Sequence, residues 1–146
     1  MHNKQYQLFQ TNWILPTGKS STDQISSLCV GSILNLCCGI SKLGYCVDID
    51  RTLSPSMLAD IFHLPFRRQS FDTIIIDPPY RYFVTGSNRF RWIFAASDIA
   101  RKRLILSSGQ IFIRIPNFKL VDIIAVIPRT FFVRLWYVYD RINEVL

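Results

Sequence analysis

Residues 73–76, with the sequence Thr-Ile-Ile-Ile, constrain the fold more than any other part of the chain. All four side chains are β-branched and none is charged, which suits a strand buried on both faces of a sheet. The run stops at Asp77-Pro78-Pro79, where two prolines cannot continue a hydrogen-bonded ladder. A strand covered on both faces is typical of a parallel sheet, so the run predicts an α/β fold.

Further apolar segments predict more strands, and the first four predicted strands end in a glycine or an acid. The predicted strands are 32–37, 45–48, 57–59, 73–76, 110–115, 123–127 and 131–139. The residues at the first four ends are Gly39, Asp48, Asp60 and Asp77. Because ligands bind beyond the carboxyl ends of strands in open α/β sheets, these four residues are predicted to surround one ligand site.

The second half of the chain predicts a helix and then a hairpin. Apolar residues recur at helical spacing over 88–104, and Arg101-Lys102-Arg103 would lie in the last turn, where cations complement the helix dipole. Pro128-Arg129-Thr130 is a tight connection between the last two predicted strands, and it predicts an antiparallel hairpin. Asp72 is predicted to be a turn residue ahead of its strand.

The composition bounds the class of protein. The 146 residues suit one domain, 1–146, in which 1–28 form a polar lead-in segment. No apolar run reaches the roughly 20 residues of a membrane span, and the first residues lack an apolar signal segment. We therefore expect a cytoplasmic protein without a membrane partner. The four cysteines form no CxxC pair, so they are expected to act as small buried hydrophobes, and no metal site is expected.

A net charge of +7 predicts a polyanionic partner, with nucleic acid as the first candidate. Arg81, Arg89 and Arg91 lie among aromatic residues, a pattern that suits single-stranded or flipped nucleic acid through charge and stacking. The alternative for the net charge is a generally basic proteome or a choice that favours solubility. The alternative for the three arginines is an ordinary helix start packed on the sheet.

The strand-end residues also suit an adenosine moiety. A glycine after the first strand lets a ligand approach the backbone closely. An acid at the end of the second strand can take both ribose hydroxyls, and an acid after the third can accept a hydrogen bond from the adenine amino group. The full glycine-rich dinucleotide fingerprint is absent, so nothing calls for a pyrophosphate.

Four segments in order resemble the motifs of class I S-adenosylmethionine-dependent methyltransferases. They are 34–39 (Leu-Asn-Leu-Cys-Cys-Gly), 47–50 (Val-Asp-Ile-Asp), 59–66 (Ala-Asp-Ile-Phe-His-Leu-Pro-Phe) and 70–80 (Ser-Phe-Asp-Thr-Ile-Ile-Ile-Asp-Pro-Pro-Tyr). The fourth has the form that amino-methyltransferases use. The resemblance covers about 31–80 and implies a Rossmann-like, seven-stranded sheet, mostly parallel, whose last strand is antiparallel.

The resemblance further implies S-adenosylmethionine as the cofactor and assigns roles to individual residues. Those implied for cofactor binding are Asn35, Cys37, Cys38, Gly39, Ile40, Asp48, Ile49, Asp60, Ile61 and Asp77. The implied catalytic residues are Asp77, Pro78, Pro79 and Tyr80. Asp77 and the Pro78 carbonyl would accept the two hydrogens of an exocyclic amine and favour a more tetrahedral nitrogen, while Tyr80 would stack on the base.

The link between the first two predicted strands departs from the family pattern. Only the seven residues 38–44 separate Cys37 from Tyr45, which is too few for the usual helix. The first-strand side of the site is therefore expected to be open. We expect residues 6–15, which are rich in aromatic and aliphatic side chains, or a second copy of the chain in a homodimer, to cover it.

The sequence therefore favours an enzyme that methylates an exocyclic amine of a DNA or RNA base. Two alternatives stay open. The first is a methyltransferase of a protein or a small molecule, and the second is a non-catalytic module that binds the cofactor or nucleic acid.

Overall fold

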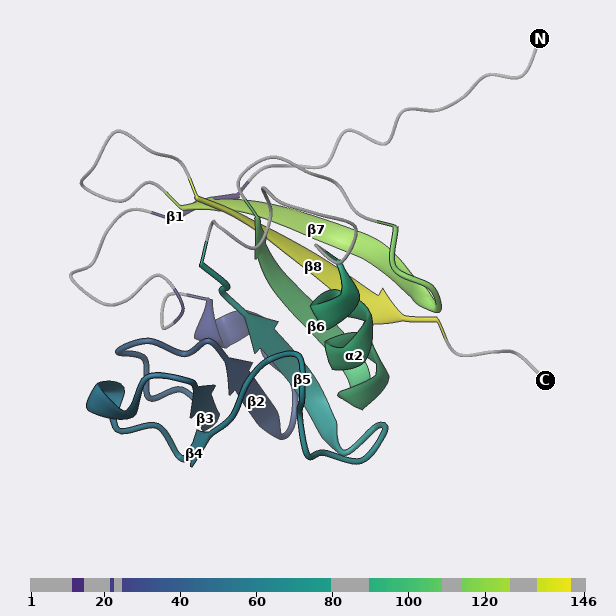
Figure 1. Cartoon of the computed structure of the whole chain (residues 1–146). Coiled ribbons are helices and arrows are strands. Elements are labelled where there is room, and N and C mark those ends of the chain that lie inside the picture. Colours follow the sequence, from purple (N-terminus) through teal and green to yellow (C-terminus); the bar gives the residue numbers. More distant parts are fainter. Residues whose placement is uncertain are drawn as a thin grey trace, which may run out of the picture.

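The computed structural model describes residues 12–14, 22, 25–79, 90–108, 114–126 and 134–142, and Figure 1 shows them arranged around one twisted sheet. The elements in chain order are β1 (Asn12–Ile14), η1 (Ser26–Leu28), β2 (Ile33–Leu36), β3 (Tyr45–Asp48), η2 (Arg51–Leu53), β4 (Met57–Leu58), β5 (Phe71–Ile76), α2 (Arg91–Ile99), β6 (Ala100–Ser108), β7 (Phe118–Val126) and β8 (Arg134–Arg141). The strand order is β1-β7-β8-β6-β5-β2-β3-β4.

The sheet is mostly parallel, with a single reversal at the end of the chain. The pairs β3–β4, β2–β3, β2–β5 and β5–β6 are parallel, whereas β8 runs antiparallel to both β6 and β7. Apart from β1, this is the predicted seven-stranded sheet with an antiparallel last strand. The sequence did not predict β1, which adds an eighth strand beside β7.

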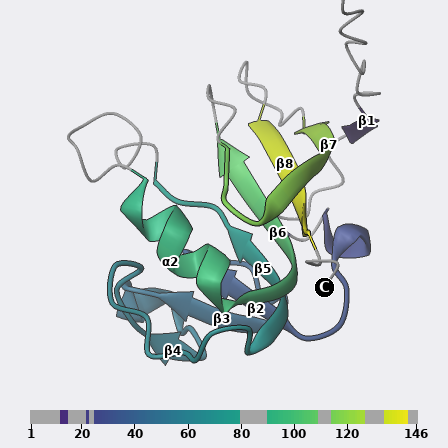
Figure 2. The same cartoon turned by 90° about the vertical axis from the view of Figure 1, so that its right-hand side faces the viewer.

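The sheet carries a buried layer on each face, and β5 contributes to both. Ile74 and Ile76 pack into the cluster under α2, while Ile75 points to the opposite face, and all three are fully buried. Figure 2 shows α2 lying over the first of these faces. The β-branched run was therefore correctly predicted as a strand covered on both sides.

The face opposite α2 is covered in part by the end of the lead-in segment. Ile25 is fully buried there and packs with Ile75 and Ile105. Residues 37–44 contain no helix, as the short link predicted. The prediction that 6–15 cover the first-strand side is wrong for 12–14, because β1 pairs with β7 at the far edge of the sheet. The other residues of 6–15 lie outside the described part of the chain.

The predicted helix ends five residues too late. The structure ends α2 at Ile99 and begins β6 at Ala100, so Arg101, Lys102 and Arg103 lie on a strand. Ala100 and Leu104 are four residues apart, a spacing that places them on one face of either a helix or a strand. The cation at the helix C-terminus is instead Arg141 of β8, whose Nη2 donates to the carbonyl oxygens of Ser97 at 2.8 Å and Ala100 at 2.7 Å.

The remaining strand predictions are shifted along the chain. The strand after the helix is β6, not the predicted strand at 110–115. That prediction is wrong for residues 114–115, which lie in a loop before β7. Residues 110–113 lie outside the described part of the chain. β7 begins five residues earlier than predicted, at Phe118. The predicted hairpin is present as the antiparallel β7–β8 pair.

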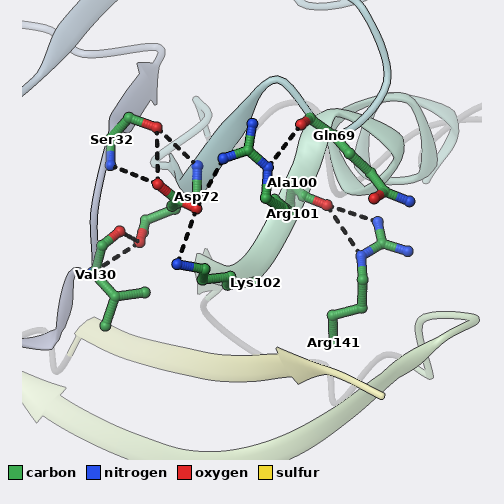
Figure 3. A network of polar contacts seen from close by, with 9 residues as sticks. Val30, Ser32, Gln69, Asp72, Ala100, Arg101, Lys102 and Arg141 are labelled. Carbon is green, nitrogen blue, oxygen red and sulfur yellow. Dashed lines mark hydrogen bonds and ion pairs between the residues drawn. The ribbon is translucent and has the colours of Figure 1, made fainter. Parts of the chain in front are cut away.

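Asp72 was predicted to be a turn residue, but it lies within β5 and is buried, and its carboxylate binds residues of neighbouring segments (Figure 3). Its Oδ2 accepts hydrogen bonds from the backbone nitrogen of Ser32 at 3.0 Å and from the Ser32 hydroxyl at 3.2 Å. Its Oδ1 lies 3.2 Å from both Arg101 Nη1 and Lys102 Nζ. The carboxylate thus joins the segment before β2 to β6 across the start of β5.

These hydrogen bonds predict a specific loss of stability in acid. The backbone donor at Ser32, helped by Lys102, lowers the pKa of Asp72 from 3.8 to about 2. A carboxyl whose pKa is lower in the folded state stabilises the fold above its ordinary pKa, and this contribution disappears as the pH falls from about 4 toward 2. We expect the difference in urea midpoint between the wild type and Asp72→Asn to narrow over that range. A constant difference would show that the Asp72 charge does not stabilise the fold.

Among the described residues, no helix is long and apolar enough to cross a membrane.

Candidate active site

A pocket of about 570 Å³ opens beyond the carboxyl ends of β2, β3, β4 and β5, within the usual size range of small-molecule sites. It is lined by Thr22, Leu36, Cys37, Cys38, Gly39, Ile40, Val47, Asp48, Ile49, Asp50, Leu53, Ala59, Asp60, Ile61, Leu64, Asp77, Pro78, Pro79 and Arg134. The glycine and three acids that follow the first four predicted strands, Gly39, Asp48, Asp60 and Asp77, therefore share one pocket.

All of the residues predicted for cofactor binding line this pocket except Asn35. The Asn35 side chain is fully buried, and its Nδ2 donates to Ser41 Oγ and to the Leu43 carbonyl oxygen, both at 3.2 Å. Its partners belong to the short link between β2 and β3. Asn35 therefore holds this link by hydrogen bonds and does not itself line the pocket.

Asp48, the last residue of β3, shapes the pocket through its carboxylate. Oδ2 accepts a hydrogen bond from the backbone nitrogen of Gly39 at 3.0 Å, and Oδ1 accepts one from the backbone nitrogen of Asp50 at 3.0 Å. These bonds tie the β2–β3 turn to the residues after β3. Ile40 and Ile49, which also line the pocket, are 77% and 64% exposed, so the lining includes two aliphatic residues that are largely open to solvent.

Asp48→Ala should weaken the binding of S-adenosylmethionine roughly ten- to a hundredfold. The predicted charge-assisted bond from Asp48 to a ribose hydroxyl would contribute about 1.5–3 kcal/mol. The variant also leaves the Gly39 backbone N–H without its acceptor. Calorimetric titration checks this, with Asp50→Ala as the matched variant. If Asp48→Ala binds as the wild type does and Asp50→Ala does not, the ribose role belongs to Asp50.

Asp60, two residues after β4, is half-exposed at the pocket and carries a local turn. Its Oδ1 accepts a hydrogen bond from the backbone nitrogen of Phe62 at 3.0 Å, and its Oδ2 lies 3.8 Å from His63 Nδ1. Ile61, next to it, is 5% exposed and belongs to the core under α2. The pocket wall here therefore joins a carboxylate to a buried aliphatic side chain.

Asp77 follows β5 directly, and its mostly buried carboxylate is part of the pocket lining. Burial raises the pKa of this carboxyl above its usual range, while the charge of Arg134 and a hydrogen bond from Ser107 oppose the increase. Pro78 and Pro79 follow it in the lining. Tyr80, Arg81 and Arg89 lie outside the described residues. Arg91, the first residue of α2, is exposed and is not part of the lining.

Arg134 is a pocket residue that the sequence did not predict. It begins β8, and its Nη1 donates to Asp77 Oδ2 at 2.6 Å. A charged residue within the apolar run 131–139 was the signal that could have found it. Thr22, from the lead-in segment, also lines the pocket and was not predicted.

Cys37 occupies an unusual backbone position at the end of β2. It has a positive φ of 53°, the region that favours glycine, and its side chain lines the pocket. Burial, followed by the negative charges of Asp48, Asp77 and Asp60, raises the pKa of the thiol to about 12. Cys37 therefore contributes a neutral thiol at physiological pH, not a nucleophile. The described residues contain no cluster of side chains suited to hold a metal ion.

Comparison with solved structures finds the same arrangement in other proteins. Magnesium protoporphyrin IX methyltransferase (ChlM) from Synechocystis PCC 6803 with bound S-adenosylmethionine aligns with a TM-score of 0.58 and 16% identity, over 82% of this chain and 77% of that chain. The same enzyme with bound S-adenosylhomocysteine gives a TM-score of 0.56 at 14% identity, over 82% of this chain and 81% of that chain. A candidate methyltransferase from Escherichia coli, YhhF, gives a TM-score of 0.54 at 12% identity, over 93% and 91% of the two chains.

The chain shares its fold with these solved structures, two of which hold S-adenosylmethionine or S-adenosylhomocysteine. No family model and no curated protein matches the sequence. The likeness to the solved structures is therefore one of fold, at 12% to 16% sequence identity. In this fold, the described pocket lies at the carboxyl edge of the parallel strands.

Proposed function

We propose that this protein is an S-adenosylmethionine-dependent methyltransferase that methylates an exocyclic amine of a nucleic-acid base. One observation carries the proposal: Asp77 and Pro78 line the same pocket as Asp48 and Asp60. The acids proposed to hold the ribose and adenine therefore lie in one space with the groups proposed to orient an amine. The methyl donor and its acceptor would meet there without a large movement of the sheet.

The charge of the pocket supports a cationic methyl donor. Among the described residues, four carboxylates, those of Asp48, Asp50, Asp60 and Asp77, line it together with one guanidinium, that of Arg134. S-adenosylmethionine carries a positive sulfonium, whereas the sulfur of the product is neutral. Since opposite charges attract more strongly in a pocket of low dielectric constant than in water, this lining favours the donor over the product.

The proposed transfer conserves atoms and charge. S-adenosylmethionine, held by Asp48 and Asp60, would supply the methyl group to the amine nitrogen. The carbon–sulfur electron pair would stay on sulfur and leave neutral S-adenosylhomocysteine. The methylated nitrogen then loses one proton to solvent. Asp77 and the Pro78 carbonyl would accept the amine hydrogens before the attack, which positions the lone pair in line with the methyl group.

Nucleic acid is favoured as the substrate by the net charge of +7 and by the basic and aromatic residues around 80–92. We propose Arg81, Arg89 and Arg91 as contacts for it and Tyr80 as the stacking side chain. The solved structures share their fold with this chain but leave its substrate open, since ChlM is by name a methyltransferase of magnesium protoporphyrin IX.

The test combines cofactor binding with a survey of acceptors. Calorimetry with S-adenosylmethionine comes first, followed by transfer of a labelled methyl group to DNA, RNA, protein extract and small amines. We expect binding and an N-methylated nucleoside, identified by mass spectrometry after digestion. Methylation of only protein or small molecules would contradict the substrate class. Binding without any transfer would identify a non-catalytic module, and absence of binding would contradict the proposal as a whole.

A further inference from the structure

The Arg134 guanidinium lies against the carboxylate of Asp77, the acid that we assign to methyl transfer. Its Nη1 lies 2.6 Å from Asp77 Oδ2, and the two side chains are only 30% and 18% exposed. Because β8 runs antiparallel to β6, the amino end of β8 lies at the same sheet edge as the carboxyl ends of β5 and β6. The reversed direction of β8 therefore places Arg134 beside Asp77 at the end of β5, although the two residues are 57 positions apart in the sequence.

Arg134 is the one cation among the described residues of the pocket lining. The titratable groups that face this space from the other described elements are two thiols and four carboxyls: Cys37 and Cys38 after β2, Asp48 at the end of β3, Asp50 before η2, Asp60 after β4, and Asp77 after β5. α2 contributes no residue to the lining. Burial raises the pKa of both thiols to about 12, so neither Cys37 nor Cys38 titrates together with the acids. Burial disfavours a charge on Asp77, and Arg134 is the group whose charge opposes this effect.

We propose that Arg134 is a positioning residue: it keeps Asp77 ionised and holds its Oδ2, so that Oδ1 is aimed at the amine that receives the methyl group. This role rests on the function proposed above and assigns no new chemical step. An ionised carboxylate accepts an amine hydrogen, whereas a protonated one would present a donor to it. Arginine suits the task because it stays charged at every pH at which the enzyme would work.

The proposal predicts a change in the pH dependence of turnover. In Arg134→Met, the acid limb of the kcat profile should move to higher pH by about one unit or more, because the buried carboxyl loses its cationic partner. Arg134→Lys should keep the limb close to that of the wild type. The titration of the Asp77 carboxyl carbon, followed by NMR and assigned with Asp77→Asn, should shift in Arg134→Met by the same amount without any need for activity.

Arg103→Met is the matched control. Arg103 and Asp140 form a similar pair between β6 and β8, with Nε–Oδ1 at 2.7 Å and Nη2–Oδ2 at 3.0 Å, outside the pocket. Its loss should lower the melting temperature and leave the acid limb in place. An acid limb and a carboxyl titration that do not move in Arg134→Met would overturn the positioning role, even if the variant is less stable. If the wild type transfers no methyl group, the proposed function is overturned. The NMR titration of Asp77 in Arg134→Met still tests whether Arg134 keeps this carboxyl ionised.

Discussion

Asp77→Asn should lose most methyl transfer while its affinity for S-adenosylmethionine stays within a few-fold of the wild type. The proposed bond runs from the amine to the carboxylate and gains strength as the nitrogen becomes positive in the transition state. Neutralising such a preorganised group commonly lowers kcat by about a hundredfold or more. The substitution keeps the size of the side chain at a site where the carboxylate is mostly buried, so the pocket keeps its shape. Single-turnover rates and calorimetry separate the two effects.

Asp98→Asn provides a matched control for this variant. Asp98 lies on α2, is 60% exposed and pairs with Arg68 at 3.7 Å, away from the pocket. The same chemical change there should leave both turnover and cofactor affinity unchanged, because an exposed pair of this kind contributes little. A transfer rate near that of the wild type in Asp77→Asn would contradict the amino-methyltransferase mechanism.

The strand ends were predictable because their signals are local. The run at 73–76 reveals a doubly buried strand by its side chains alone, and the acid that follows it marks the sheet edge where ligands bind. The same reasoning placed Gly39, Asp48 and Asp60 at that edge, and the structure brings all of them into one pocket. Their cofactor and catalytic roles remain predictions for the assays described above.

The features that the sequence did not predict depend on contacts between distant segments. Arg134 enters the pocket only because β8 is reversed, and a local pattern gives no sign of which strand end an arginine will meet. Ile25 looks like part of a polar lead-in, but it is fully buried against Ile75 and Ile105. The end of α2 was misplaced because a spacing of four residues fits a strand as well as a helix.

The short β2–β3 link depends on one glycine for its closure. Gly44, the residue before β3, has a φ of +70°, and a Cβ atom there would lie 2.7 Å from the backbone oxygen and the Cβ of Ile33, the first residue of β2. Gly39, at the other end of the link, has a φ of +55° and no atom within 4 Å of a Cβ position. The two glycines share a left-handed backbone and differ in the space around them. The link also accepts Cys37 at a φ of 53°, so left-handed backbone alone does not demand glycine here.

Gly44→Ala should therefore destabilise the fold by about 3 kcal/mol or more, whereas Gly39→Ala should cost only about 1–2 kcal/mol. The loss expected for Gly39→Ala is the strain of placing a residue with a side chain in the left-handed region. Gly44→Ala adds to this strain an overlap between the new Cβ and the backbone of Ile33, which can be relieved only if β2 and β3 move apart. Since a domain of this size is stabilised by about 5–15 kcal/mol, the Gly44 variant should lose a large share of its stability. Urea unfolding of the two variants without cofactor measures the difference. Equal losses would mean that the link shifts to accept a side chain at Gly44, and that the close approach to Ile33 does not hold the two strands together.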